Sequence, residues 1–328
     1  MKQYMTKYRF LFMGLAAAFL FTACGDDDEI VDNGPKPLVL EAYSYTYNVG
    51  EEPAIWANTK DPVGIYVMDS ATGGVVAPHA NIPYLGIGSS RQAYLVPVDN
   101  ATIPYFAENG ADRDVAAYFP YSEDNSGHVT LDVSKQGLIN LRTFLFSRVN
   151  GLSAASPKAT LELRPVFANL VFHFHAGGNL KMAQLDDMKL TLSGIPSTGD
   201  FDIARSTLTI GAERLPKVGV TVKIPTAPAD APAPGVTREA YISEAYLLPV
   251  LSTEGYRAVI TLAGDNAPEY TVDLSKYTSL LSSAMKYEFT VVVTEKSATC
   301  TMVNGPIGDW NTGGEDLDFE IEEPIENL

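Results

Sequence analysis

Residues 159–163 read Ala159-Thr160-Leu161-Glu162-Leu163, an alternation of apolar and polar side chains with a period of two. Successive side chains of a β-strand point to opposite faces of the sheet, so this pattern places one face against a core and the other in water. The same alternation recurs at residues 42–47, 129–133, 190–192, 218–224, 258–262 and 287–293. We therefore predict an all-β protein whose half-buried strands form antiparallel sheets.

The chain is long enough for two domains, because its 328 residues exceed what one hydrophobic core usually serves. A composition of 46% hydrophobic and 19% charged residues is typical of a globular protein. A stretch rich in Gly, Ser, Ala and Pro at residues 150–158 separates the earlier strands from the later ones. We place the boundary there, which gives domains at residues 38–156 and 157–328. The one helix candidate is the segment from Ser275 to Met285.

The N-terminus has the parts of a secretory signal. Three basic residues lie within the first nine positions, and an apolar run from Phe10 to Phe21 follows. This run is shorter than the ~20 residues that a membrane-spanning helix needs, so residues 1–23 are predicted to be a cleaved signal peptide.

Cys24 follows the small residues Thr22 and Ala23, an arrangement that resembles the lipobox of bacterial lipoproteins. In such proteins the signal is cut before the cysteine, whose sulfur then carries a diacylglycerol and whose acyl groups include palmitate. Phe21 stands where the usual pattern has Leu. The resemblance implies lipidation at Cys24 and a stable anchor of two or three acyl chains. The alternative is an ordinary secretory signal with an incidental cysteine.

Residues 24–37 are predicted to be an acidic, Pro-containing tether. Four consecutive acidic residues at 26–29 need water around them, and Pro35 and Pro37 prevent regular strand pairing. The acidic run resembles the export signal with which Bacteroidetes lipoproteins reach the outer face of the outer membrane. A plain charged spacer is the alternative reading.

Charge and cysteine content argue against a nucleic-acid-binding protein and against a fold held by disulfides. The net charge of the whole chain is -17, and removal of residues 1–23 takes away three positive and no negative charges, leaving -20. A field of this sign repels phosphate backbones, so nucleic acid is not an expected partner. Cys300 is the only other cysteine, so an acylated Cys24 leaves no intramolecular disulfide.

Motifs for catalysis or metal binding are weak. His173 and His175 lie two residues apart on a predicted strand, but no further ligands accompany them at zinc-site spacing, and they are expected on the wet face of that strand. Ser283 and Lys286 match a Ser-x-x-Lys pattern without its companion elements. We therefore predict no catalytic residues, no metal and no cofactor, hence a protein that is not an enzyme. The 17 tyrosines leave a sugar-stacking surface conceivable.

Several short motifs in order resemble the fimbrillin-like lipoproteins of Bacteroidetes. They are Val63-Gly64-Ile65-Tyr66-Val67, Ala117-Tyr118-Phe119-Pro120-Tyr121-Ser122, the run from Thr160 to Phe174, Lys286-Tyr287-Glu288-Phe289-Thr290 and Ile307-Gly308-Asp309-Trp310. The resemblance implies two transthyretin-like antiparallel β-sandwich domains in tandem. It also implies a structural or adhesive subunit of surface fimbriae, with other fimbrial subunits, the outer membrane and a host or bacterial surface glycan or protein as partners.

In that family a protease removes the first strand after a basic residue, and a strand from a neighbouring subunit fills the groove. The tail alternates, with Leu317, Phe319 and Ile321 on one face, so it is either this donor strand or the last strand of its own sheet. No arginine occurs between Cys24 and Arg91, and the basic residues in that interval are lysines.

The missing arginine favours an accessory, anchor or tip subunit, or a protease that cuts after Lys36 or Lys60. A different class of function is also open. The chain could be a surface glycan-binding lipoprotein that does not assemble into a pilus.

Overall fold

The regular structure of the described residues consists of β-strands and three single 3₁₀ turns. The computed structural model describes residues 34–44, 61–88, 92–106, 110–136, 144–220, 222–223, 241–264, 266–302 and 319–323. The signal peptide, Cys24 and Leu317 lie outside these ranges. In the described part, no helix has the length and apolar character needed to cross a bilayer. The prediction of an all-β protein is confirmed.

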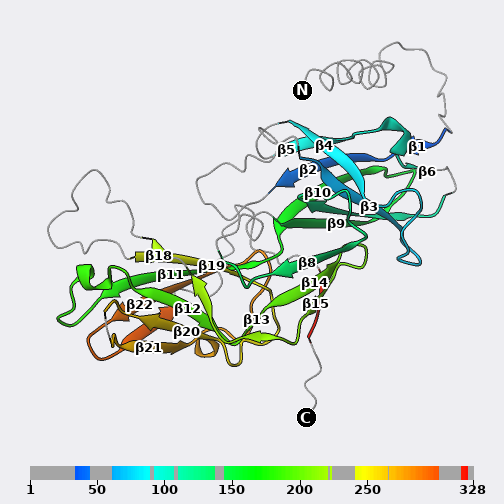
Figure 1. Ribbon diagram of the computed structural model, residues 1–328. Coiled ribbons are helices and arrows are strands. Elements are labelled where there is room, and N and C mark those ends of the chain that lie inside the picture. The colour runs from blue at the N-terminus through cyan, green and yellow to red at the C-terminus, as the bar shows by residue number, and fades with distance from the viewer. Residues whose placement is uncertain are drawn as a thin grey trace. The chain divides into compact units, whose positions relative to one another are not determined.

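Seven strands close into a barrel in the first half of the chain (Figure 1). Around the barrel they follow the order β10-β2-β5-β4-β3-β7-β9. Their bounds are β2 Val39–Ser44, β3 Val63–Asp69, β4 Ile82–Gly88, β5 Gln92–Pro97, β7 Arg113–Phe119, β9 Leu145–Leu152 and β10 Lys158–Pro165. A short pair, β1 Lys36–Pro37 with β6 Tyr105–Phe106, and the turn η1 Asn100–Thr102 accompany it.

The other described strands form three larger sheets and one short strand pair. The five-stranded sheet contains β18 Val222–Lys223, β19 Tyr241–Leu247, β11 Ala168–Ala176, β22 Lys286–Val293 and β23 Ala298–Met302. A four-stranded sheet contains β17 Val218–Val220, β12 Lys189–Ser193, β20 Arg257–Thr261 and β21 Glu269–Asp273. The strand pair is β13 Ile195–Pro196 with β16 Arg214–Leu215, and the remaining turns are η2 Met182–Leu185 and η3 Leu274–Lys276.

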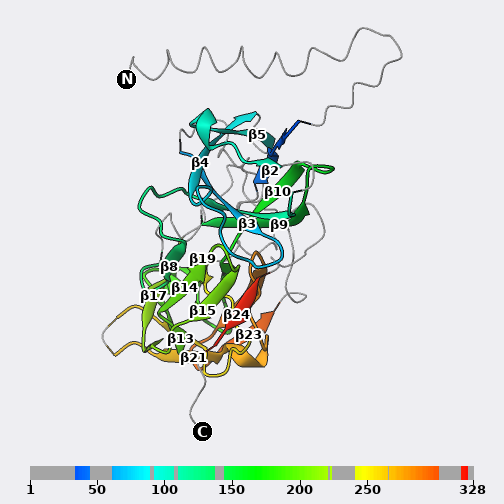
Figure 2. The ribbon, with the colours of Figure 1, turned by 90° about the vertical axis from the view of Figure 1, so that its right-hand side faces the viewer.

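The third sheet draws its strands from three distant parts of the chain. It runs in the order β24 Glu320–Glu322, β15 Thr207–Ile210, β14 Thr198–Asp202 and β8 His128–Asp132. Figure 2 shows β14, β15 and β24 side by side. This sheet therefore connects residues that precede the predicted domain boundary with the C-terminal tail.

The alternation had suggested antiparallel pairing throughout, but some of the described strands pair in parallel. Three neighbouring pairs are parallel: β10 with β2, β11 with β22, and β15 with β24. Each of these pairs joins segments far apart in the sequence, and a long connection allows a strand to enter from the same end as its neighbour. A pattern of alternating side chains carries no information about strand direction.

Two hydrophobic cores share the same barrel strands. The barrel interior contains Ile65 of β3 and Ala117 of β7. On the opposite faces of these strands, Tyr66 and Tyr118 belong to the larger core, which also contains β11, β14 and β22. Six consecutive residues of β3, from Val63 to Met68, are buried, which explains why this strand reads as a continuous apolar run.

The predicted division at residues 156/157 stays a prediction, and strands pair across it in both directions. β10 follows the boundary yet pairs with β2 and β9 in the barrel. β8 precedes the boundary yet pairs with β14. The larger core also takes side chains from both sides of this point.

The helix predicted for residues 275–285 is wrong. Only the single turn η3 is helical, and the chain after it forms a β-bridge at Leu281 and a turn at residues 283–284. Leu281 forms an antiparallel bridge with Val250, and Ala284 has a φ angle of 54°, which no right-handed helix allows. Tertiary pairing thus outweighs a weak local preference for helix.

Two of the sequence motifs contact each other directly. Gly64 of β3 lies opposite Tyr118 of β7, and a Cβ at position 64 would come 2.0 Å from the Tyr118 ring. The ring is held in this place because the Tyr118 hydroxyl donates to Asn81 Oδ1 at 2.7 Å. The glycine is therefore needed to admit the tyrosine ring.

We expect Gly64→Ala to lower the free energy of unfolding by about 1–3 kcal/mol, because a buried ring must shift to accommodate the methyl group. Urea unfolding followed by tyrosine fluorescence measures the change. Gly219→Ala is the matched control, since a Cβ at this strand position would meet no atom within 4 Å. Equal stability of the two variants would contradict this account of the motif.

Candidate functional site

The strand β2 occupies a slot between β10 and β5, with hydrogen-bonded partners on both edges. Leu38, Leu40 and Ala42 point into the barrel core and are at most 5% exposed. On the other face, Glu41 Oε1 forms an ion pair with Lys158 Nζ at 2.6 Å. Loss of β2 would leave two strand edges and an apolar slot that only another strand with alternating apolar residues could fill.

The C-terminal strand β24 pairs in parallel with the edge of β15. The ring of Phe319, just before β24, packs edge-on against Phe201 at a centroid distance of 5.3 Å. Ile321 packs against the larger core, opposite Leu208. Two of the three residues predicted as a donor strand are therefore docked on their own chain in this structure. Their role as a donor stays a prediction.

Three polar contacts accompany this docking. The Glu320 amide donates to the carbonyl oxygen of Ser206 at 2.9 Å. Thr209 donates from its hydroxyl to Glu322 at 3.1 Å, and the amide of Leu251 donates to Glu323 at 2.7 Å. With a paired length of three residues, β24 is held by few interactions compared with the central strands.

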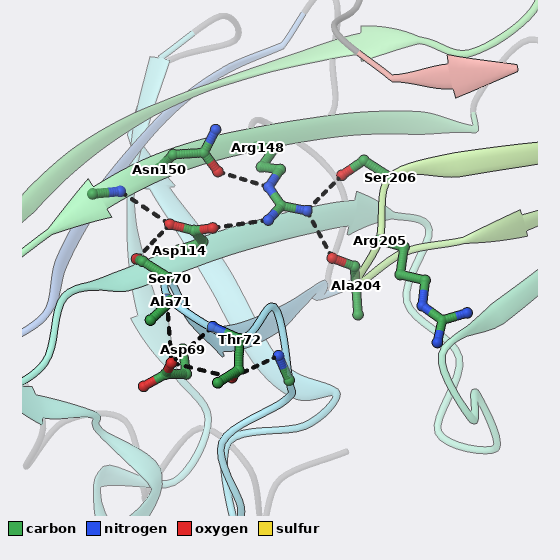
Figure 3. Close-up of polar contacts among 12 residues, drawn as sticks. Asp69, Ser70, Ala71, Thr72, Asp114, Arg148, Asn150, Ala204, Arg205 and Ser206 are labelled. Atoms are coloured by element: carbon green, nitrogen blue, oxygen red, sulfur yellow. Dashed lines mark hydrogen bonds and ion pairs between the residues drawn. The ribbon is translucent and has the colours of Figure 1, made fainter.

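Arg148 of β9 forms a partly buried junction between the barrel and the turn that joins β14 to β15 (Figure 3). Its Nη2 donates to Asp114 at 2.8 Å, and its Nε donates to Asn150 at 2.7 Å. Its Nη1 donates to the Ala204 carbonyl at 2.7 Å and to the Ser206 hydroxyl at 3.1 Å. The guanidinium thus satisfies groups from two parts of the chain at once.

The carboxylate of Asp114 is buried yet well solvated by protein donors. Burial raises its pKa, but donation from the Ser70 hydroxyl, the Gly151 amide and the Arg148 guanidinium outweighs this effect. The net result is a pKa below the ordinary value of 3.8. Sequence reasoning missed both residues. The available signal was a charged residue within an otherwise apolar strand, at Arg148 and at Asp114.

Other sequence candidates are not brought together. His173 and His175 lie half-buried on one face of β11, while Phe172 and Phe174 fill the core, as predicted for that strand. Within the described ranges, no group of three or more His, Cys, Asp or Glu side chains is placed to hold a metal ion. Ser283 is buried in a turn, and Lys286 of the Ser-x-x-Lys pattern is ion-paired with Glu288.

A cleft of about 460 Å³ lies beside β8. Its rim is polar and includes His128, whose Nδ1 is 2.7 Å from Asp200. Tyr118, Phe144 and Phe167 contribute to its lining but are at most 5% exposed, so their ring faces are not available for stacking. Cys300 is half-buried, and burial raises the pKa of its thiol to about 11, which disfavours the reactive thiolate.

Exposed aromatic side chains occur instead on the outside of the barrel. Tyr94 of β5 is 57% exposed, and Tyr105 of β6 is 58% exposed. Ile87, which is 42% exposed, lies directly opposite Tyr94. These side chains are the described surface groups best suited to contact an apolar or sugar ligand.

The fold is that of bacterial cell-adhesion proteins. A solved structure from Bacteroides uniformis, described as a "putative cell adhesion protein", aligns with a TM-score of 0.61 at 18% identity, over 81% of this chain and 97% of the other. A protein of the same description from Bacteroides ovatus aligns with a TM-score of 0.52 at 18% identity, over 83% and 97%.

The chain belongs to the fimbrillin-like family, whose model matches residues 48–310. A curated relative is the "Putative fimbrium subunit Fim1C" of Bacteroides uniformis, which is 26% identical over 94% of this chain and 98% of its own length. Members are structural and adhesion proteins of fimbriae rather than enzymes, and membership implies other fimbrial subunits as partners. The family predicted from the sequence motifs is confirmed.

The Asp114–Arg148 pair should make the free energy of unfolding depend on pH in the acidic range. A carboxylate whose pKa is lower in the folded state contributes stability above its unfolded pKa and loses it as the pH falls through the folded value. We expect the free energy of unfolding to fall below about pH 4 and this fall to be shallower in Asp114→Asn. Urea unfolding between pH 5 and pH 3 measures it.

The control for this experiment is Asp112→Asn, which changes an exposed carboxylate in the segment before β7. Its pH dependence should match that of the unmodified protein. A parallel loss of stability with acid in the Asp114→Asn and unmodified proteins would show that the junction does not titrate as described.

Proposed function

We propose that this chain is a surface-exposed, lipid-anchored subunit of a fimbrium that assembles by β-strand addition and mediates cell adhesion. One observation carries the proposal. The strand β2 fills its slot with Leu38, Leu40 and Ala42, and the tail offers Leu317, Phe319 and Ile321 at the same two-residue spacing. A tail from one subunit therefore has the pattern needed to fill the β2 slot of another.

The proposed anchor is the lipidated Cys24 behind a signal peptide of residues 1–23. The acidic tether of residues 24–37 supports display on the outer face of the outer membrane, because consecutive carboxylates remain in water. The mature chain of this proposal carries a net charge of -20, which follows from the loss of three positive charges.

The proposed position in the fimbrium is accessory, at the anchor or at the tip. Strand removal after arginine has no target between Cys24 and Arg91. A lysine-directed protease could act at Lys36, which lies in β1, or at Lys60, which lies outside the described residues. Only cleavage after Lys60 would remove β2, because Lys36 precedes this strand. A subunit that keeps its first strand cannot receive a donor, yet it can still supply its tail. The two transthyretin-like sandwich domains of the family are part of this proposal.

A second candidate function is glycan binding without pilus assembly. The exposed rings of Tyr94 and Tyr105 favour it, because sugars stack on accessible aromatic faces. Substitution of both tyrosines by serine would remove glycan binding while leaving strand assembly intact. The two candidates are therefore separable in one protein preparation.

We expect a chain that lacks the segment up to Lys60 to form SDS-resistant oligomers when it is mixed with the intact mature protein. The truncated chain exposes the β2 slot, and the intact chain supplies the tail. Gel electrophoresis without heating measures the product. The control carries Phe319→Asp and Ile321→Asp in both chains, because the truncated chain has a tail of its own and a charged tail cannot enter an apolar slot. Monomers in every mixture would refute strand addition for this chain.

Lipidation has its own test. Expressed with its signal peptide in a Bacteroidetes host, Cys24→Ala should move from the detergent phase to the aqueous phase on phase separation, because two or three acyl chains are lost. Mass spectrometry of the N-terminal peptide should show acyl groups in the protein of natural sequence and none in Cys24→Ala. Cys300→Ala should stay in the detergent phase. If the protein of natural sequence were found in the aqueous phase, the lipid anchor would be excluded.

A further inference from the structure

One residue connects the barrel with the docked tail. Ser206 is 5% exposed and lies in the turn between β14 and β15. Its hydroxyl accepts a hydrogen bond from Arg148 of the barrel at 3.1 Å, while its carbonyl oxygen accepts from the Glu320 amide of the tail at 2.9 Å. The first interaction fixes the turn and the second fixes the start of β24.

The turn needs this support because of its backbone conformation. Ser206 has a φ angle of 56°, a left-handed conformation that residues with a Cβ adopt only at a cost. Arg148 holds the turn at two points, the Ala204 carbonyl and the Ser206 hydroxyl. Without these hydrogen bonds the turn can relax, and the Ser206 carbonyl leaves the direction in which Glu320 approaches.

An apolar contact follows the same route. Phe146 lies two residues before Arg148, on the same face of β9, and its ring packs against Phe201 at a centroid distance of 4.8 Å. Phe319 of the tail packs against the same Phe201 ring at 5.3 Å. β9 therefore contacts the tail indirectly by two routes, the buried ring of Phe201 and the turn that contains Ser206.

The barrel strand that carries these side chains is tied to the β2 slot. β9 pairs with β10, and β10 pairs along six residues with β2. A change in β2 alters the strand next to β9. The tail itself is weakly held, since short edge strands with few contacts are the first parts of a protein to open.

We propose that Arg148 is a positioning residue that couples the state of the barrel to the docking of the C-terminal strand. With β9 in place, Arg148 orients the Ser206 carbonyl and β24 stays on β15. A shift of β9 removes this support and releases the strand. Release as a donor rests on the proposed function above, whereas the coupling itself is a property of the single chain. This coupling would keep the C-terminal strand docked on β15 until β9 has shifted.

Hydrogen exchange of the full mature chain, measured by mass spectrometry, tests the coupling in a monomer. In Arg148→Met, amides of residues 319–323 should exchange about tenfold faster or more, as expected for loss of charged hydrogen bonds that hold the docking turn. Exchange in β11 and β22, remote from the junction, should be unchanged. Because no assembly is involved, this result is independent of whether the chain forms fimbriae.

Two further variants separate coupling from general destabilisation. Arg205→Ala removes a neighbouring arginine whose side chain is 80% exposed and points away from the network, so tail exchange should not change (Figure 3). Ser206→Gly loses the hydroxyl but adopts a positive φ freely, so it should give a smaller increase than Arg148→Met. Unchanged tail exchange in Arg148→Met, or equal acceleration in β11 and the tail, would overturn the proposal.

Discussion

Burial of barrel strands on both faces is the constraint on which the rest of the structure depends. β3, β7 and β9 supply one set of side chains to the barrel interior and the other set to the larger core. A sheet with one wet face could exist without the second half of the chain, but these strands cannot. The contact of Gly64 with the Tyr118 ring shows how tightly the two strands are fitted. The cores are therefore interdependent, and loss of one exposes apolar surface of the other.

The partly buried Arg148 has a different role in this architecture. A guanidinium held by an ion pair and several neutral acceptors adds specificity more readily than net stability, because its desolvation offsets much of the attraction. Its acceptors come from the barrel and from the turn between β14 and β15. This arrangement fixes which turn conformation the chain adopts, and so determines where the C-terminal strand finds a hydrogen-bonding partner.

In the proposed function, strand interfaces rather than a pocket form the functional surface of this protein. The aromatic rings that line the cleft beside β8 are buried. Lys286, the lysine of the Ser-x-x-Lys pattern, is ion-paired with Glu288. By contrast, β2 is a short strand seated between β10 and β5, and β24 is a short edge strand paired with β15 alone among the described strands. The proposed assembly would use these strands, because a strand from one subunit can replace an equivalent strand in another.

The sequence by itself determined the class of structure and the family. Alternation at residues 159–163 and at 287–293 predicted strands because side-chain periodicity is local, and the ordered motifs identified the fimbrillin-like family. Only the tertiary structure decided strand direction, the replacement of the helix predicted before Lys286 by a β-bridge and turns, and the partners of Arg148. These depend on segments that are distant along the chain and meet only on folding, so no local pattern records them. The alternating tail shows the same limit: its sequence predicts a strand, but the edge on which it docks is set by β15 and Phe201.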